Sequence, residues 1–191
     1  MGNREDLLAG AKQCLMEKGY ARTTARDIAA AAGTSLAAIG YHFRTTQALL
    51  NAALFEAMAE WGEELTGALT GAVTTDAPAA ERLERGWSWI IRSFDEQRRL
   101  WVTQLEMVSA AEHVPELREQ LVPGMTAARH GMAELFAGLD PAVDPERARR
   151  VGSLYQALLT GVLVQHLVDP ETAPSGHDLV EALRAVATDL S

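Results

Sequence analysis

Side chains that can bind phosphate or read a base edge gather between residues 24 and 46 of this 191-residue chain. Hydroxyl groups, two arginines and an adjacent tyrosine and histidine supply hydrogen-bond donors, which phosphate oxygens accept. Small residues lie among these donors and would let the backbone approach a polyanion closely. The candidate contact residues are Thr24, Arg26, Thr34, Ser35, Ala37, Ala38, Gly40, Tyr41, His42, Arg44 and Thr46.

Patterns typical of catalysis or metal binding are missing from the sequence. It contains no G-x-S-x-G nucleophile motif, no phosphate loop of either glycine-rich type and no Cys/His spacing of a zinc site. The five histidines are scattered along the chain. We therefore expect a protein that is not an enzyme and that has no metal and no cofactor.

The local sequence around the donors predicts a helix-turn-helix. Thr24 can cap a short helix, with Asp27 three residues on as in a capping box. An Ala-Gly-Thr turn at 32–34 leads to a second helix that ends near 41–43, which is the short glycine-containing turn of this motif. The second helix of a helix-turn-helix lies in the major groove of DNA.

The apolar positions of the motif are expected to pack beneath it. Ile28 on the first helix, and Leu36 or Ile39 on the second, should face inward. Phe43 closes the motif and is expected in the core rather than on DNA, because an aromatic ring at that place buries a large apolar area.

Charge is distributed unevenly between the two ends of the chain. The net charge is −9, which by itself argues against a nucleic-acid partner. Residues 1–50, however, carry six basic and four acidic side chains, whereas the other 141 residues carry 11 basic and 22 acidic ones. This asymmetry favours an N-terminal part that approaches an anion, although chance could also produce so small an excess.

The stretch TTARDIAAAAGTSLAAIGYHFRTTQALL resembles the DNA-binding domain of the TetR (tetracycline repressor) family of bacterial transcriptional regulators. The resemblance covers about fifty residues near the N-terminus. The matching positions, in the family's order, are Thr24, Ile28, Ala29, Ala32, Gly33, Ser35, Tyr41, His42, Phe43 and Leu49.

The resemblance implies a complete architecture. It is an all-α fold in which residues 1–48 form a three-helix helix-turn-helix domain and residues 49–191 form a helical domain for ligand binding and dimerisation. It also implies a sequence-specific regulator, most often a repressor, that binds a palindromic double-stranded DNA operator as a homodimer. A small-molecule effector would release it from that operator.

Two positions depart from the family's pattern. Gly40 stands where the family often has tyrosine, which lowers the helix propensity by about 1 kcal/mol relative to alanine. Thr46 stands where a lysine usually begins the fourth helix, so a phosphate contact there would be weaker. Both departures put the base preference in doubt.

The rest of the chain reads as helices, about nine in all, without strand-like alternation. Pro123 and Gly124 are expected to interrupt one of these helices, and residues 73–78 form the only candidate linker. Two C-terminal helices, over 146–167 and 177–190, suit a four-helix dimer interface in which Gly152 and Gly161 permit close packing. The alternative is that these helices are buried within one subunit. A stripe along the last helix would comprise Leu179, Leu183, Val186 and Leu190.

A ligand pocket is harder to place from the sequence. Aromatic and methionine side chains suit a mainly apolar cavity with few polar groups, and hence an apolar or aromatic effector. The many acidic residues would instead suit a cationic effector. The residues that the resemblance places there are Trp87, Trp101, Gln104, Glu106, Met125, His130 and Tyr155, and Trp89, Met107, Met132 and Gln156 lie on the same helices. A plain core or surface position is the alternative for each of them.

The sequence also bears on where the protein is located. The polar N-terminal residues show no secretory signal, and the apolar stretch near 162–168 is too short and too polar to span a bilayer. Cys14 is the only cysteine, so no intramolecular disulfide can form. We therefore expect a cytoplasmic protein. Two other functions stay open. One is a helical carrier or enzyme that retains the fold, and the other is an architectural DNA binder without an effector.

Overall fold

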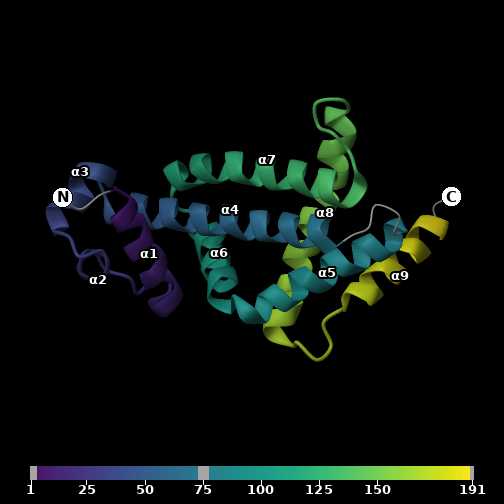
Figure 1. Ribbon diagram of the computed structural model, residues 1–191, viewed down its shortest axis with the longest axis horizontal. Helices are drawn as coiled ribbons and strands as arrows, with labels where there is room; N and C mark the ends of the chain where they lie inside the picture. The colour runs from purple at the N-terminus through teal and green to yellow at the C-terminus, as the bar shows by residue number, and fades with distance from the viewer. Residues whose placement is uncertain (1–3, 73–77, 190–191) are drawn as a thin grey trace. The chain divides into compact units, whose positions relative to one another are not determined.

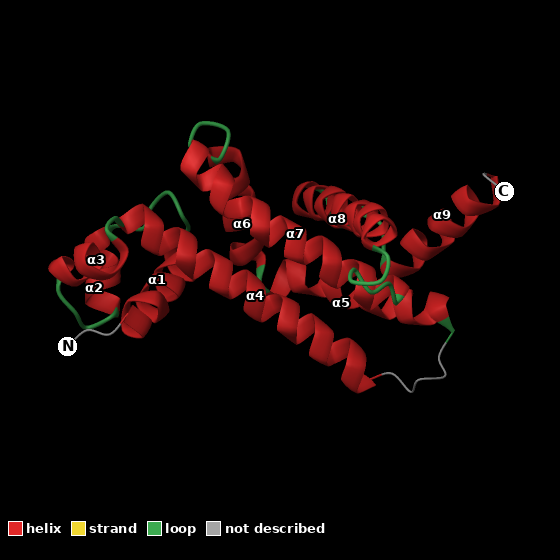
Figure 2. Cartoon of the chain, turned by 90° about the horizontal axis from the view of Figure 1, so that it is seen from above, coloured by secondary structure: helices red, strands yellow, loops and turns green. Residues whose placement is uncertain are grey.

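The computed structural model describes residues 4–72 and 78–189, and all regular structure in these ranges is helical (Figure 1). Figure 2 shows the same helices from above, with only loops and turns between them. The predicted all-α fold is thereby confirmed. The helices in the described ranges are α1 (Arg4–Lys18), α2 (Ala25–Ala31), α3 (Leu36–Phe43), α4 (Thr46–Ala72), α5 (Ala79–Glu96), α6 (Arg98–Ala110), α7 (Pro115–Ala137), α8 (Pro145–Val168) and α9 (Gly176–Asp189).

The packing of the backbone divides the chain into two compact units. One unit comprises Met1–Trp61 and Gln97–Val122, and the other comprises Gly62–Glu96 and Pro123–Ser191. Both α4 and α7 begin in the first unit and continue into the second. The predicted boundary between residues 48 and 49 separates a DNA-binding from a ligand-binding domain by function, not by backbone packing. It stays a prediction.

The first unit is built around α1, which packs against α2 and α6, while α2 packs against α3. A stripe of α1 that includes Leu7, Leu8, Ala11 and Leu15 is buried, as its helical spacing requires, and Met16 lies at the edge of the stripe with 36% exposure. Elsewhere in the unit, Trp61 of α4 meets Trp101 of α6 edge to face, with 4.7 Å between ring centroids.

Glycines set the local geometry at the two turns of the first unit. Gly19 has φ +81° after α1, and Gly33 has φ +60° in the turn between α2 and α3, a region that other residues rarely adopt. Gly10 serves a different purpose, since a Cβ there would lie 2.8 Å from the backbone nitrogen of Ala32. The absence of a side chain at Gly10 therefore lets α1 and α2 approach closely.

The second unit has α5 at its centre, in contact with α8 and more extensively with α9, which lies beside it in Figure 1. Trp87 is fully buried and stacks on Phe136 of α7, with ring centroids 5.9 Å apart. His166 of α8 is also buried, and its Nε2 lies 3.0 Å from the carboxylate of Asp95. Its buried ring nitrogen is therefore satisfied by a partner on α5.

The predicted interruption at Pro123 is wrong, because α7 continues through it as one helix. Proline removes the N–H that would bond the carbonyl of Glu119, but both residues are exposed, so water can satisfy that carbonyl. Leu121 before the proline and Met132 after it are both buried.

The prediction for Gly152 is also wrong. A Cβ at Gly152 would lie 2.0 Å from the carbonyl oxygen of Arg129, so this glycine packs against α7 of its own chain rather than serving a dimer interface. Gly161 has nothing within 4 Å of its Cβ position and faces open space. On α9, Leu179 is buried and Val186 is 57% exposed, while Leu190 and the linker at 73–77 lie outside the described residues.

Candidate nucleic-acid interface

The predicted recognition helix is α3, an eight-residue helix that packs on two side chains. Ile39 and Phe43 are 3% and 8% exposed, so they form its inner face, as predicted for Phe43. Leu36 is 50% exposed and does not pack inward. It is the first residue of α3.

The opposite face of α3 carries small residues that are open to solvent. Ala37 and Gly40 are exposed, and Ala38 is half-buried. A Cβ added at Gly40 would meet nothing within 4 Å, so nothing in the protein requires glycine there. On this face of α3 only small side chains cover the backbone, so the walls of a DNA groove could approach it closely.

Tyr41 is the most prominent side chain on this surface, with 85% exposure. Its ring meets His42 edge to face with 4.9 Å between centroids, and His42 is half-buried. Within the described ranges, the Tyr41 hydroxyl makes no hydrogen bond. The Tyr41 ring thus contacts His42, and its hydroxyl remains available to donate a hydrogen bond.

Ser35 and Thr34 precede α3. Ser35 is the N-cap residue by its backbone, yet its side chain makes no capping hydrogen bond. Its hydroxyl is exposed, and Thr34 is half-buried beside it. Both hydroxyls therefore remain available at the N-terminal end of α3, where backbone N–H groups also favour an anion.

Thr24 is engaged in the predicted capping box of α2. Its backbone N–H and its hydroxyl donate to Oδ2 of Asp27 at 2.9 and 2.7 Å, and its hydroxyl accepts from the Asp27 backbone at 3.3 Å. Lys18 lies 2.5 Å from the other carboxylate oxygen. Because the single hydroxyl proton of Thr24 is donated to Asp27, a phosphate contact by this hydroxyl would compete with the cap.

Arg26 lies in the first turn of α2, Arg44 follows α3, and Thr46 begins α4. Arg26 and Arg44 are exposed, and neither side chain has an ion-pair partner in the part of the chain that the structure describes. Arg44 has φ +67°, so it reverses the chain directly after α3. Thr46 is half-buried, and the preceding Thr45 caps α4 by accepting from the backbone N–H of Ala48 at 3.0 Å.

All eleven predicted contact residues thus lie at the surface or half-buried in one unit, at the start of α2, on α3 and in the turns on either side of α3. Comparison with known families matches residues 7–53 to "Bacterial regulatory proteins, tetR family" and residues 78–189 to "Tetracyclin repressor-like, C-terminal domain". The chain belongs to the TetR family. It is a regulator of the helix-turn-helix type, as the sequence predicted.

Solved structures show the same fold along nearly the whole chain. A protein from Streptomyces coelicolor A3(2), described as a transcriptional regulator, is 23% identical with a TM-score of 0.69, and 96% of each chain is covered. The multidrug binding protein EbrR, complexed with imidazole, is 23% identical with a TM-score of 0.67, covering 94% of this chain and 93% of EbrR. A TetR regulator from Haloarcula marismortui ATCC 43049 is 22% identical with a TM-score of 0.62, covering 97% and 94%. No curated protein matches the sequence.

The residues predicted to bind a ligand are divided between the two units of this TetR-family chain. Trp101, Gln104 and Glu106 belong to α6 in the first unit, and Trp101 is buried beside Trp61. The second unit holds the other four, which are Trp87, Met125, His130 and Tyr155.

Among those four, Trp87 and Tyr155 share a neighbour. Tyr155 lies 5.2 Å from the ring centroid of Phe136, on which Trp87 also stacks, and burial raises the pKa of the Tyr155 hydroxyl. Met125 is 39% exposed and His130 is half-buried. The role of all seven residues in ligand binding stays a prediction.

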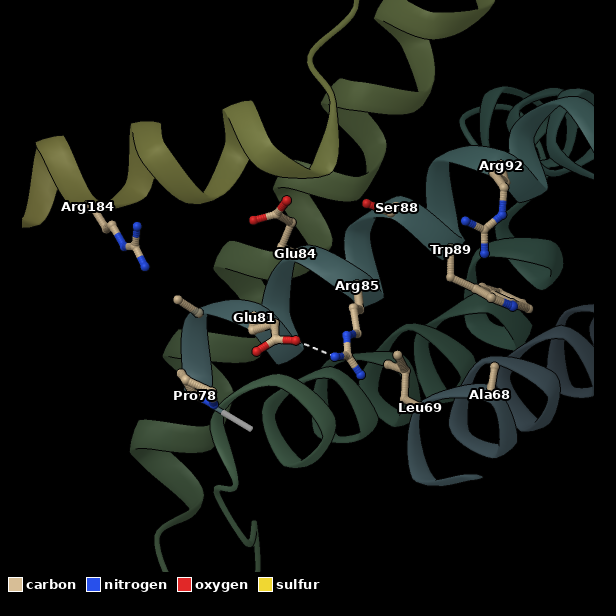
Figure 3. Close-up of a pocket in the computed structure, with 11 residues that line it drawn as sticks. Ala68, Leu69, Pro78, Glu81, Glu84, Arg85, Ser88, Trp89, Arg92 and Arg184 are labelled. Atoms are coloured by element: carbon tan, nitrogen blue, oxygen red, sulfur yellow. Dashed lines mark hydrogen bonds and ion pairs between the residues drawn. The ribbon is translucent and has the colours of Figure 1, made fainter. Parts of the chain in front are cut away.

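A pocket of about 670 Å³ lies elsewhere in the second unit, on the face of α5 that carries Glu81, Arg85, Ser88, Trp89 and Arg92 (Figure 3). None of the seven predicted ligand residues lines it. The spacing of charged and polar side chains three and four apart along 81–92 was the signal in the sequence for this face. Within the described ranges, no group of three or more His, Cys, Asp or Glu side chains is placed to hold a metal ion.

Proposed function

We propose that this TetR-family regulator represses transcription from a palindromic operator and leaves that operator when a small molecule binds its C-terminal domain. The observation that supports the proposal is the outer face of α3. Small residues expose the backbone there, and Tyr41 and Ser35 present hydroxyls that form no hydrogen bond within the described residues. Such a helix can enter the major groove, while hydroxyls and arginines around it bind phosphates.

We propose a homodimer through α8 and α9. The outward face of α8 is apolar, with Leu154, Val164 and Val168 exposed by 50%, 45% and 81%, and Gly161 leaves room at its middle. By length and composition alone α8 would suffice to cross a membrane, and 28% of its apolar window is buried within the chain. A second copy would cover this face, as apolar faces at such interfaces require.

The mechanism proposed is a population shift in a cytoplasmic protein that acts by binding and not by catalysis. Two recognition helices of a dimer must fit half-sites separated by one or more helical turns of DNA. An effector can bind more tightly to a conformation in which the two recognition helices have a different spacing. Its binding then lowers the affinity for the operator, at most by the ratio of the effector's affinities for the two conformations.

The test is binding of the purified full chain to the DNA that flanks its own gene, at two salt concentrations, against a scrambled duplex. We expect tighter binding to the flanking DNA and a loss of affinity as salt rises, because phosphate neutralisation releases counterions. Equal binding to both duplexes would favour an architectural DNA binder. Failure to bind either duplex, together with turnover of a bound molecule, would favour a carrier or enzyme that retains the fold.

A further inference from the structure

The pocket on α5 has walls from three helices of the same unit. Residues of α5 form its floor, Leu69 of α4 forms one wall, and Arg184 of α9 forms another (Figure 3). A volume of about 670 Å³ is within the range that small-molecule sites occupy. Trp89 supplies an aromatic surface among these residues.

Two glycine contacts hold the walls of the pocket against α5. A Cβ at Gly176, the first residue of α9, would lie 2.5 Å from the Ser88 hydroxyl and 2.7 Å from the Glu84 carbonyl. A Cβ at Gly86 would lie 2.4 Å from the Phe136 ring and 3.3 Å from Leu69. At Gly176, α9 is therefore packed against α5 as closely as the two backbones allow, and at Gly86 the rings and methyl groups of neighbouring helices lie directly on α5. Such close packing favours a preformed site.

Most charged groups of the pocket have a partner within the protein. Arg85 pairs with Glu81 one turn earlier on α5. Arg184 lies 2.5 Å from Glu181, and Glu84 lies 3.3 Å from Nδ1 of His177.

Arg92 is different from the other charged residues of the pocket. It is exposed, and it has no ion pair or hydrogen bond within the described residues. Figure 3 shows its guanidinium near the Trp89 side chain, at the end of the pocket away from Pro78. Of the three arginines and two glutamates that line the pocket, Arg92 is the one without a hydrogen-bond or ion-pair partner in the described residues, and it lies beside an indole ring.

We propose that this pocket binds a planar aromatic molecule that carries one carboxylate, with the ring against Trp89 and Leu69 and the carboxylate on Arg92. A guanidinium binds a carboxylate through two parallel hydrogen bonds, whereas a ligand cation here would meet an unneutralised positive charge. The sequence's overall acidity led to the expectation of a cationic ligand. The charge of the residues around the pocket determines which ligand binds there, and at Arg92 that charge is positive. That this ligand acts as the effector rests on the proposed function. That it binds to the pocket does not depend on the proposed function.

The experiment is calorimetric titration of the full chain, without DNA, with 2-naphthoate and with its uncharged analogue 2-naphthamide. We expect 2-naphthoate to bind about tenfold more tightly, as one charge-assisted contact predicts. Arg92→Gln should abolish this preference, and Trp89→Leu should weaken both ligands. Arg147→Gln, which removes an exposed arginine of α8 outside the pocket, should change neither.

Equal affinity for the acid and the amide would overturn the proposal, as would no binding of 2-naphthoate at millimolar concentration or a preference that survives Arg92→Gln. The circular dichroism of each variant shows that it is folded. A DNA titration then separates the two proposals. If 2-naphthoate binds through Arg92 but operator affinity does not change, the site stands and effector release through it fails.

Discussion

Asn51 donates from Nδ2 to Oε1 of Gln120 at 3.0 Å, across 69 positions of the sequence. On its other side Asn51 accepts through Oδ1 from the Tyr20 hydroxyl and, at 3.2 Å, from Nε2 of Gln47. Asn51 is 4% exposed, and burial also raises the pKa of Tyr20 to about 12. One buried amide therefore joins the loop after α1 and the starts of α4 and α7.

Replacing Asn51 should destabilise the first unit. Asn51→Leu keeps the volume but leaves the Tyr20 hydroxyl without its acceptor, so we expect the free energy of unfolding to fall by about 1–3 kcal/mol. Gln120→Ala removes only an exposed partner and should cost about 1 kcal/mol or less. Urea unfolding followed by circular dichroism measures both. Equal losses for the two variants would show that burial of Asn51 does not matter.

The local features of the fold were predictable from the sequence, because they depend on a few neighbouring residues. The capping box of Thr24 and Asp27 and the turn at Gly33 follow from residue type and spacing alone. The buried ring of Phe43 followed from its place at the end of the motif.

Features that depend on distant residues could not be predicted in this way. Gly152 has the same signature in sequence as Gly161, but only Gly152 meets a backbone carbonyl of α7. The local preference of Pro123 is to end a helix, yet α7 continues through it, with buried residues on both sides. The pocket on α5 required knowledge of which helices lie against it, since Leu69 and Arg184 are far away in the chain.

The capping box should make stability depend on pH. The Lys18 ammonium, and then the hydroxyl and backbone N–H of Thr24, lower the pKa of Asp27 from 3.8 to about 2. Because the folded pKa is below the unfolded one, Asp27 contributes stability above about pH 4, and this contribution disappears as pH falls toward 2. Asp27→Asn should therefore be less stable than the parent at neutral pH, with a gap that closes over this range.

Two further variants separate the cap from the charge. Thr24→Ala should cost about 1 kcal/mol, as loss of an N-cap does. Glu134→Gln, which removes an exposed carboxylate of α7 outside the capping box, is the matched control for the loss of one carboxylate. Thermal unfolding between pH 2 and 7 measures all three, and a constant gap for Asp27→Asn would contradict the assignment.

The two glycines of α8 should respond oppositely to alanine. Gly152→Ala places a methyl group 2.0 Å from a backbone carbonyl that cannot move freely, so we expect a loss of about 3 kcal/mol or more. Gly161→Ala meets no atom of its own chain and should raise the helix propensity by about 1 kcal/mol. Analytical ultracentrifugation then tests the proposed dimer, which Gly161→Ala should weaken. An unchanged dimer constant would place the interface elsewhere.

Tyr41 should matter for DNA and not for folding. Its side chain is 85% exposed, so Tyr41→Ala should change the free energy of unfolding by less than about 0.5 kcal/mol. Tyr41→Phe removes only the hydroxyl, and loss of one hydrogen bond to a phosphate should weaken operator binding about tenfold. Tyr41→Ala also removes the ring that meets His42 and should weaken it further.

The control for Tyr41 is Val143→Ala, which truncates a side chain that is 80% exposed and belongs to the other unit. Fluorescence anisotropy with the flanking DNA measures all three variants at one salt concentration. A phosphate contact is the same for every sequence, so Tyr41→Phe should weaken binding to the operator and to the scrambled duplex by the same factor. A loss confined to the operator would mean that Tyr41 reads a base edge, and no loss at all would remove it from the interface.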